Sequence, residues 1–251
     1  MKNVSMRKIV SAAAVAIGLG VAALGGGGLF GAESGGSPAP TSVEANASQS
    51  VATSTVATAR KASLAVFDAP DGAPAELSPL PNPRPSGAPL VLLVVEDRPG
   101  WLQVQLPERP NGSTGWVRAG EVTTSSHQFR IEVSLGGHVL TAFDGDQRIL
   151  ETPVAVGAEM TPTPTGHFYT TELLRPTNPR GAYGPYAFGL SAHSDVLTDF
   201  AGGDGTVGIH GTNDPSSLGT DASHGCVRID NEAITFLAES VPAGTPVDIV
   251  A

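Results

Sequence analysis

The chain has 251 residues, which is enough for one large domain or two small ones. Charged residues make up 15% of it, and the formal net charge is −10 at pH 7. Proteins that bind nucleic acid through its phosphates carry basic patches, so this acidic composition excludes that class of function. The 31 glycines and 21 prolines favour short strands joined by turns over long helices.

The N-terminal segment 1–32 has the pattern of an export signal. An apolar stretch from Ile9 to Leu24 follows three basic residues, Lys2, Arg7 and Lys8. A basic start followed by an apolar stretch is typical of a secretory signal peptide. Cleavage after Gly25 fits this pattern, but the apolar stretch is also nearly long enough to stay uncleaved as a membrane anchor. In both cases we predict that the rest of the chain is extracytoplasmic.

A flexible linker is predicted for residues 33–60. This segment consists mainly of Ser, Ala, Thr, Gly and Pro and contains no aromatic residue. Such a composition offers little apolar surface to bury in a core. The linker would hold the folded part of the chain away from a membrane.

The first folded unit is predicted to span residues 61–124 and to be a small β-barrel. Residues 90–95 form a short apolar run, and residues 101–106 alternate between apolar and polar side chains. Asn111-Gly112 is typical of a turn, after which residues 115–117 begin another predicted strand. Several short strands within so few residues are typical of a small barrel.

The stretch from Gly100 to Val117 resembles the Src-homology-3-like module that often precedes a wall transpeptidase domain in actinobacteria. This resemblance implies a docking or wall-binding unit, with the Pro-rich segment from Pro79 to Pro89 as an excursion of its barrel. Trp101 and Trp116 either stack against a glycan or peptide, or fill the core of the barrel. Small domains need large side chains in their core, which favours the second interpretation.

The second folded unit is predicted to span residues 127–251 and to be mainly β with one or two helices. Residues 129–135 alternate between apolar and polar side chains, which predicts a half-buried strand. Apolar residues recur at helical spacing from Ile234 to Val241 after Asp230, a good N-cap, so a helix is predicted there. Further strands are predicted at residues 139–143, 148–156, 167–171, 186–191, 207–209 and 245–250.

Residues with reactive side chains gather in the segment 209–228. Cys226 is the only cysteine of the chain, and it is either an inert core residue or a reactive thiol. A thiol becomes a strong nucleophile when a nearby imidazole takes its proton, which gives a thiolate–imidazolium pair. His224 lies two residues before Cys226 and would share its face if this segment were a strand. His210, at the end of a neighbouring predicted strand, is placed to reach Cys226 across the sheet.

The same segment supports two interpretations. Gly225 leaves room for a substrate carbonyl to approach the backbone, so the N–H groups of Gly225 and Cys226 would donate hydrogen bonds to a developing oxyanion. The alternative is a metal site, because His210, His224 and Cys226 are residue types that bind zinc.

The segments Ile209–Pro215 and Ser223–Arg228 together resemble the signature of the L,D-transpeptidase (YkuD) family. In this signature His is followed by Gly-Thr, and after a loop come Ser-His-Gly-Cys, an apolar residue and Arg. The likeness extends to Thr161–Gly166 and Tyr183–Tyr186 and covers the whole second unit. The resemblance implies a YkuD-type β-sandwich after the small β-barrel, and a cysteine acyltransferase that needs no cofactor or metal.

The resemblance also implies catalytic roles for three residues. Cys226 would be the acylated nucleophile and His210 the general base, while His224 would lie beside the oxyanion. The carbonyl of Gly211 would orient His210. Some members have Ser and Asn in place of Gly211 and Arg228, so the preferred acyl donor stays open. The substrate-binding residues implied are Gly211, Thr212, Ser223, Gly225, Arg228 and Tyr186.

The reaction implied is 3→3 cross-linking of peptidoglycan stem peptides in the cell envelope or cell wall. Cys226 would attack the carbonyl before the terminal D-Ala of a tetrapeptide stem, and an amine of a second stem would resolve the thioester. Water as the acceptor would instead give L,D-carboxypeptidase activity, and a non-catalytic wall-binding protein is a further alternative. Carbapenem-type β-lactams are expected to acylate Cys226, and Arg228, Arg175 or Arg180 to bind stem carboxylates.

Overall fold

The computed structural model describes residues 52–76, 78–199 and 203–251. The predicted export signal and most of the predicted linker lie outside these residues. No helix within the described ranges is both long enough and apolar enough to cross a membrane.

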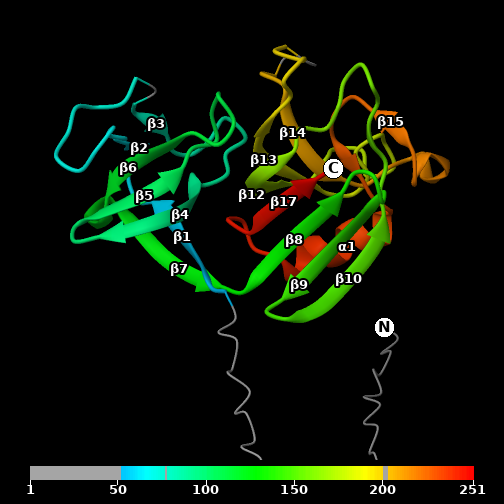
Figure 1. Cartoon of the computed structure of the whole chain (residues 1–251), viewed down its shortest axis with the longest axis horizontal. Coiled ribbons are helices and arrows are strands. Elements are labelled where there is room, and N and C mark those ends of the chain that lie inside the picture. Colours follow the sequence, from blue (N-terminus) through cyan, green and yellow to red (C-terminus); the bar gives the residue numbers. More distant parts are fainter. Residues whose placement is uncertain (1–51, 77, 200–202) are drawn as a thin grey trace, which may run out of the picture. The chain divides into compact units, whose positions relative to one another are not determined.

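The first sheet has five antiparallel strands in the order β6-β5-β4-β1-β7 (Figure 1). A short pair, β2 (Ser63–Leu64) with β3 (Leu80–Pro81), and a 3-10 turn at Ala119–Glu121 accompany it. We call residues 54–127 the small unit. The five strands are β1 (Ser54–Ala59), β4 (Val91–Arg98), β5 (Trp101–Gln105), β6 (Thr114–Arg118) and β7 (Val122–His127).

Both tryptophans of the small unit are buried. Trp101 and Trp116 are each 6% exposed, which leaves no ring face available for stacking against a glycan. Phe67 packs edge-on against Trp101, with ring centroids 5.1 Å apart, and the Arg118 guanidinium lies 4.5 Å above the Trp101 ring. The interpretation of these tryptophans as core residues is therefore confirmed.

Two predicted boundaries of the small unit are wrong. Residues Ser54–Ala59 form β1, which pairs with both β4 and β7, although they were assigned to the linker. Hydrogen bonds to two neighbouring strands hold β1 in the sheet, where even its small side chains, Ala57 among them, are buried. At the other end, β7 pairs with β1 as far as His127, three residues beyond the predicted end of the unit.

The second sheet has eight strands in the order β10-β9-β8-β17-β12-β13-β14-β16. Its neighbours are antiparallel except for β17 with β8 and β14 with β16, which are parallel. We call residues 128–251 the large unit. The strands are β8 (Phe129–Ser134), β9 (Val139–Asp144), β10 (Gln147–Pro153), β12 (Gly166–Leu174), β13 (Ala187–His193), β14 (Thr206–His210), β16 (Val227–Arg228) and β17 (Pro246–Val250).

Strand β12 joins the two halves of the second sheet. Its residues 166–169 pair with β17, whereas its residues 170–174 pair with β13, with a register shift between Thr170 and Glu172. A register irregularity of this kind bends a strand, so the sheet changes direction here. The sheet therefore places β14 and β16 at the end opposite to β10.

The helix α1 (Asn231–Ser240) covers the core of the large unit. Asp230 caps it as predicted, because its side chain accepts a hydrogen bond from the Glu232 N–H at 2.7 Å. Ile234 and Leu237 are fully buried in one cluster with strand residues such as Ile209. A mainly β unit with a helix near its C-terminal end is thus confirmed, and α1 is the one α-helix of the described residues.

Candidate active site

The end of the second sheet places His210 beside the segment that carries Cys226. His210 is the last residue of β14, and it pairs in parallel register with Arg228 of β16. Cys226 lies directly before β16, so its side chain is on the same face as those of Arg228 and His210. A cavity of about 160 Å³, which we call the cysteine cavity, is lined among others by Tyr183, His210, His224, Cys226 and Arg228.

His210 is held in one orientation by its neighbours. It is buried, and its Nδ1 lies 2.6 Å from the carbonyl oxygen of Gly211. A carbonyl only accepts hydrogen bonds, so Nδ1 carries the proton and Nε2 is the basic nitrogen. The Tyr183 ring covers the imidazole, with ring centroids 4.7 Å apart. The orienting role predicted for the Gly211 carbonyl matches this contact.

Asn231, the first residue of α1, fixes the backbone that orients His210. Its Oδ1 accepts a hydrogen bond from the Thr212 N–H at 3.0 Å, and its Nδ2 donates to the Thr212 carbonyl at 2.9 Å. A Cβ at Gly211 would lie 2.2 Å from Asn231 Oδ1, so only glycine fits there. Asn231 was not singled out from the sequence, where it reads as an ordinary helix N-terminus.

The loop that carries Cys226 is built around the Ser223 hydroxyl. Ser223 Oγ donates to the Cys226 carbonyl at 2.6 Å and accepts from the Gly225 N–H at 3.0 Å. Thr163 Oγ1 donates to the Gly225 carbonyl at 2.9 Å, and Thr161 Oγ1 to the Ser223 carbonyl at 3.2 Å. Gly225 has φ +113°, a value that L side chains rarely adopt. These bonds hold the loop in one shape.

Two predictions about this loop are wrong. His224 and Cys226 do not lie on one strand, because β15 (Asp221–Ser223) ends before them and Gly225 turns the chain. They line the same cavity nonetheless. The Gly225 N–H is engaged by Ser223 Oγ and is not free to donate to an oxyanion. The Cys226 N–H is therefore our candidate donor.

Burial keeps both central groups neutral at pH 7. It lowers the pKa of His210 to about 4, although the hydrogen bond to Gly211 raises it, and the charge of Arg228 lowers it further. Burial also raises the pKa of the Cys226 thiol. A hydrogen bond with the Gly208 backbone and the charge of Arg228 both lower this pKa, but burial has the larger effect. A resting thiolate–imidazolium pair, as the sequence suggested, is not favoured by these shifts.

The predicted substrate-binding residues divide into two groups. Arg228 lines the cysteine cavity. Thr212 and Ser223 instead use their polar groups to hold the loops around His210 and Cys226. The backbone carbonyl of Tyr186 accepts a hydrogen bond from the Gly211 N–H at 3.3 Å. The Arg175 guanidinium lies 5.3 Å from the centroid of the Tyr186 ring.

The zinc alternative finds no support in the geometry. Within the described residues, no group of three or more His, Cys, Asp or Glu side chains is arranged to hold a metal ion. His210, His224 and Cys226 line one cavity without forming such a group.

A larger groove of about 430 Å³ also reaches His210 and Cys226. It extends to Glu172 on β12 and to Arg84, which belongs to the small unit. Sequence reasoning missed both residues, because they meet only when the Pro-rich segment of the small unit contacts β12.

The family model described as the L,D-transpeptidase catalytic domain, YkuD, matches residues 128–249. The Bacillus licheniformis protein named "Putative L,D-transpeptidase YkuD" is 36% identical over 154 residues, which are 59% of this chain and 85% of that protein. The chain belongs to the YkuD family of L,D-transpeptidases. It is thus an enzyme of a cysteine transpeptidase family.

Other similar proteins match smaller parts of the chain. The Bacillus subtilis protein named "Putative L,D-transpeptidase YkuD" is 40% identical over 122 residues, 48% of this chain and 65% of that protein. The solved structure of Bdellovibrio bacteriovorus Bd1075 is 29% identical, covering 49% of this chain and 48% of that one with a TM-score of 0.39. The chain therefore spans about two thirds of the Bacillus subtilis protein and about half of the Bdellovibrio protein.

Proposed function

We propose that the protein is an L,D-transpeptidase that forms 3→3 cross-links in peptidoglycan, with Cys226 as nucleophile and His210 as base. The observation that carries the proposal is the tautomer of His210. Its Nδ1–H is bound to the Gly211 carbonyl, so Nε2 is its one proton acceptor on the face that also carries Cys226.

In the first half-reaction the thiol attacks the carbonyl that precedes the terminal D-Ala of a tetrapeptide stem. As Cys226 Sγ bonds to the carbonyl carbon, His210 Nε2 takes the thiol proton. The Cys226 N–H donates to the oxyanion, a type of interaction that often contributes strongly to catalysis. The amide C–N bond then breaks, His210 returns the proton to the leaving amine, and D-Ala departs from a thioester.

In the second half-reaction an amine of a neighbouring stem resolves the thioester. The amine nitrogen bonds to the acyl carbon and gives a proton to neutral His210. The C–S bond breaks, and the Cys226 sulfur recovers the proton as the cross-linked product leaves. Arg228, which lines the cysteine cavity, is placed to bind a stem carboxylate.

We further propose that the five-stranded small unit is an Src-homology-3-like module, and that the bent second sheet provides the two layers of a YkuD-type sandwich. The pattern of residues 1–32 supports an extracytoplasmic location in the cell envelope, secreted or anchored. Carbapenem-type β-lactams are proposed as acylating inhibitors, because their strained carbonyl presents the same target to Cys226.

The test is product analysis with tetrapeptide stems. We expect the purified chain to release D-Ala and form dimers of the stem, and Cys226→Ala to do neither. His210→Gln should form product at least about 100-fold more slowly, as expected for loss of a general base. Tripeptide product without dimers would identify a carboxypeptidase instead. A folded, reduced parent without either product would contradict the proposal.

A further inference from the structure

Two glycines, Gly189 and Gly208, line the larger groove between Cys226 and Glu172. In the sheet register Glu172 pairs with Gly189, and Gly189 pairs with Gly208. Since Ile209 pairs with Val227, Cys226 lies beside Gly208. Register partners present the same face, so a row without side chains connects Cys226 to Glu172. Cβ atoms would also meet obstacles here, 3.1 Å from Glu172 Cγ at Gly189 and 2.7 Å from the Phe188 carbonyl at Gly208.

The length of this row suits an extended peptide. Three steps between neighbouring strands of about 4.8 Å each separate the Cα atoms of Cys226 and Glu172 by about 14 Å. An extended chain covers this distance with about four residues. In a tetrapeptide donor the three residues that end at the scissile carbonyl cover about 10 Å when extended, and a side chain that carries a carboxylate adds the remaining reach toward Glu172.

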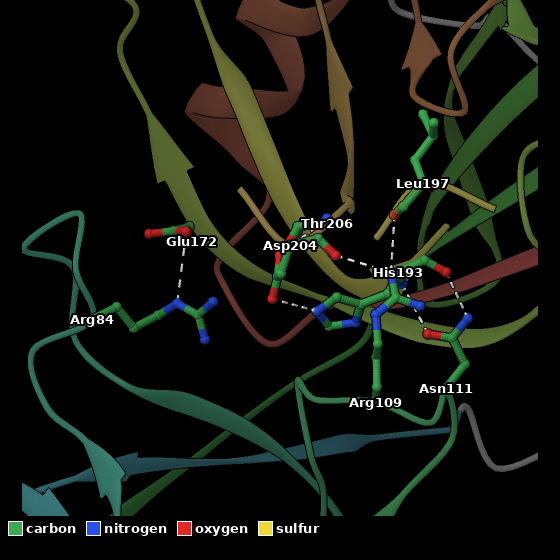
Figure 2. A network of polar contacts seen from close by, with 8 residues as sticks. All are labelled: Arg84, Arg109, Asn111, Glu172, His193, Leu197, Asp204 and Thr206. Carbon is green, nitrogen blue, oxygen red and sulfur yellow. Dashed lines mark hydrogen bonds and ion pairs between the residues drawn. The ribbon is translucent and has the colours of Figure 1, made fainter. Parts of the chain in front are cut away.

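An arginine of the small unit lies at the far end of the row. Arg84 Nε is 3.6 Å from Glu172 Oε1, which is longer than a good hydrogen bond, and this buried nitrogen has no hydrogen-bond partner. Figure 2 shows the two terminal nitrogens of Arg84 pointing away from Glu172. Glu172 is held in turn by a hydrogen bond from Ser86 Oγ. The ion pair thus leaves Arg84 able to bind another anion.

The small unit holds Arg84 firmly at this place. The Arg84 N–H donates to the Ala88 carbonyl at 2.8 Å, and Asn82 ties the same segment to the Leu90 N–H at 2.9 Å. The small unit also contacts the large unit through Asn111, whose side-chain amide exchanges two hydrogen bonds of 2.8 Å with the backbone of His193 (Figure 2). Because the backbone that carries Arg84 is fixed in advance, less entropy is lost when its side chain binds a ligand.

We infer that Arg84 forms a carboxylate subsite for the acyl-donor stem, so that the small unit contributes directly to substrate binding. The donor peptide lies along the glycine row, and a carboxylate on a residue before the scissile one binds the guanidinium of Arg84. Glu172 positions Arg84. This inference rests on the proposed function, because it takes a stem peptide as the substrate.

The test compares Arg84→Gln with the parent on two tetrapeptide donors, one with its remote carboxylate free and one with it amidated. On the free donor we expect Arg84→Gln to raise KM about 10- to 100-fold, as for loss of a hydrogen bond to a charged group, with a smaller change in kcat. On the amidated donor the parent should already show the raised KM, and Arg84→Gln should change it little. Arg84→Lys should restore part of the binding.

Arg148→Gln is the matched control, because Arg148 is an exposed arginine of the large unit that also pairs with a glutamate, Glu151. Arg148→Gln should leave the KM for both donors unchanged. An equal KM change on both donors, or none on either, would overturn the subsite. Carbapenem adducts on Cys226, measured by intact-mass spectrometry, distinguish failure of the proposed function from failure of the subsite alone. If the parent forms no adduct, the proposed function is contradicted. If every variant forms an adduct but Arg84→Gln changes KM equally on both donors, only the subsite is contradicted.

Discussion

At the scale of single residues, the charge state of His210 decides how the proposed reaction begins. Because its pKa is lowered to about 4 by burial, the imidazole is neutral at pH 7 and ready to accept a proton. The thiol is neutral as well, since burial raises its pKa. In the proposed mechanism, proton transfer therefore accompanies the attack on the substrate, and no thiolate needs to form beforehand.

The acid limb of the acylation rate follows from this pKa. The rate should stay level from neutral pH downward and fall with a midpoint near pH 4, because His210 is then protonated. Stopped-flow acylation across pH, with a parallel check that the protein is folded, measures it. Tyr183→Ala uncovers the imidazole and should move the midpoint upward. A midpoint near 6.5 in the parent, the ordinary value for histidine, would contradict buried His210 as the base.

The same shift links folding stability to pH. The pKa of His210 is depressed on folding, so the unfolded chain binds its proton more readily between about pH 4 and 6.5. Its contribution to the free energy of unfolding is fully present above pH 6.5 and is lost as pH falls toward 4.

At the scale of elements, the N-terminus of α1 acts on the base through the Gly211–Thr212 backbone. Asn231 makes two hydrogen bonds to Thr212, and the neighbouring Gly211 carbonyl orients His210. The helix thus serves as a positioning element, although it contacts neither the thiol nor the cysteine cavity through Asn231.

Asn231→Ala should lower the acylation rate by about tenfold or more, because His210 loses its fixed carbonyl partner. Thr235→Ala is the matched control, since it removes one hydrogen bond of the same helix, from Thr235 Oγ1 to the Asn231 carbonyl. Both variants should lose about 1 kcal/mol of stability or somewhat more, but only Asn231→Ala should lose activity. Acylation kinetics and thermal melts measure the two effects. Equal activity losses would show that Asn231 has a merely structural role.

Elements differ in how well the sequence predicts them. Strand β8 and helix α1 carry their own signals, an alternation of period two and a capped helical spacing. Strand β1 carries no such signal, because its small residues have the composition of a linker. It is identified as a strand only by its pairing with two neighbouring strands. Strand β16 has two residues and is formed by pairing with β14, which no local pattern reveals.

At the scale of the whole molecule, the same distinction holds for the site. His210 and Cys226 lie within one short stretch, residues 209–228, so the sequence alone could single them out as candidates. Arg84 and Glu172 are far apart in the sequence and belong to different units. Only the contact between the units brings them to one groove, so residue patterns along the chain could not have predicted the proposed subsite.

The central claim is that Cys226 is an activated acyl acceptor served by His210. Intact-mass spectrometry of the purified chain after incubation with a carbapenem tests it most directly, beside Cys226→Ala. We predict one drug adduct on the parent and none on the variant. A folded, reduced parent without an adduct, or an equal adduct on Cys226→Ala, would contradict the claim.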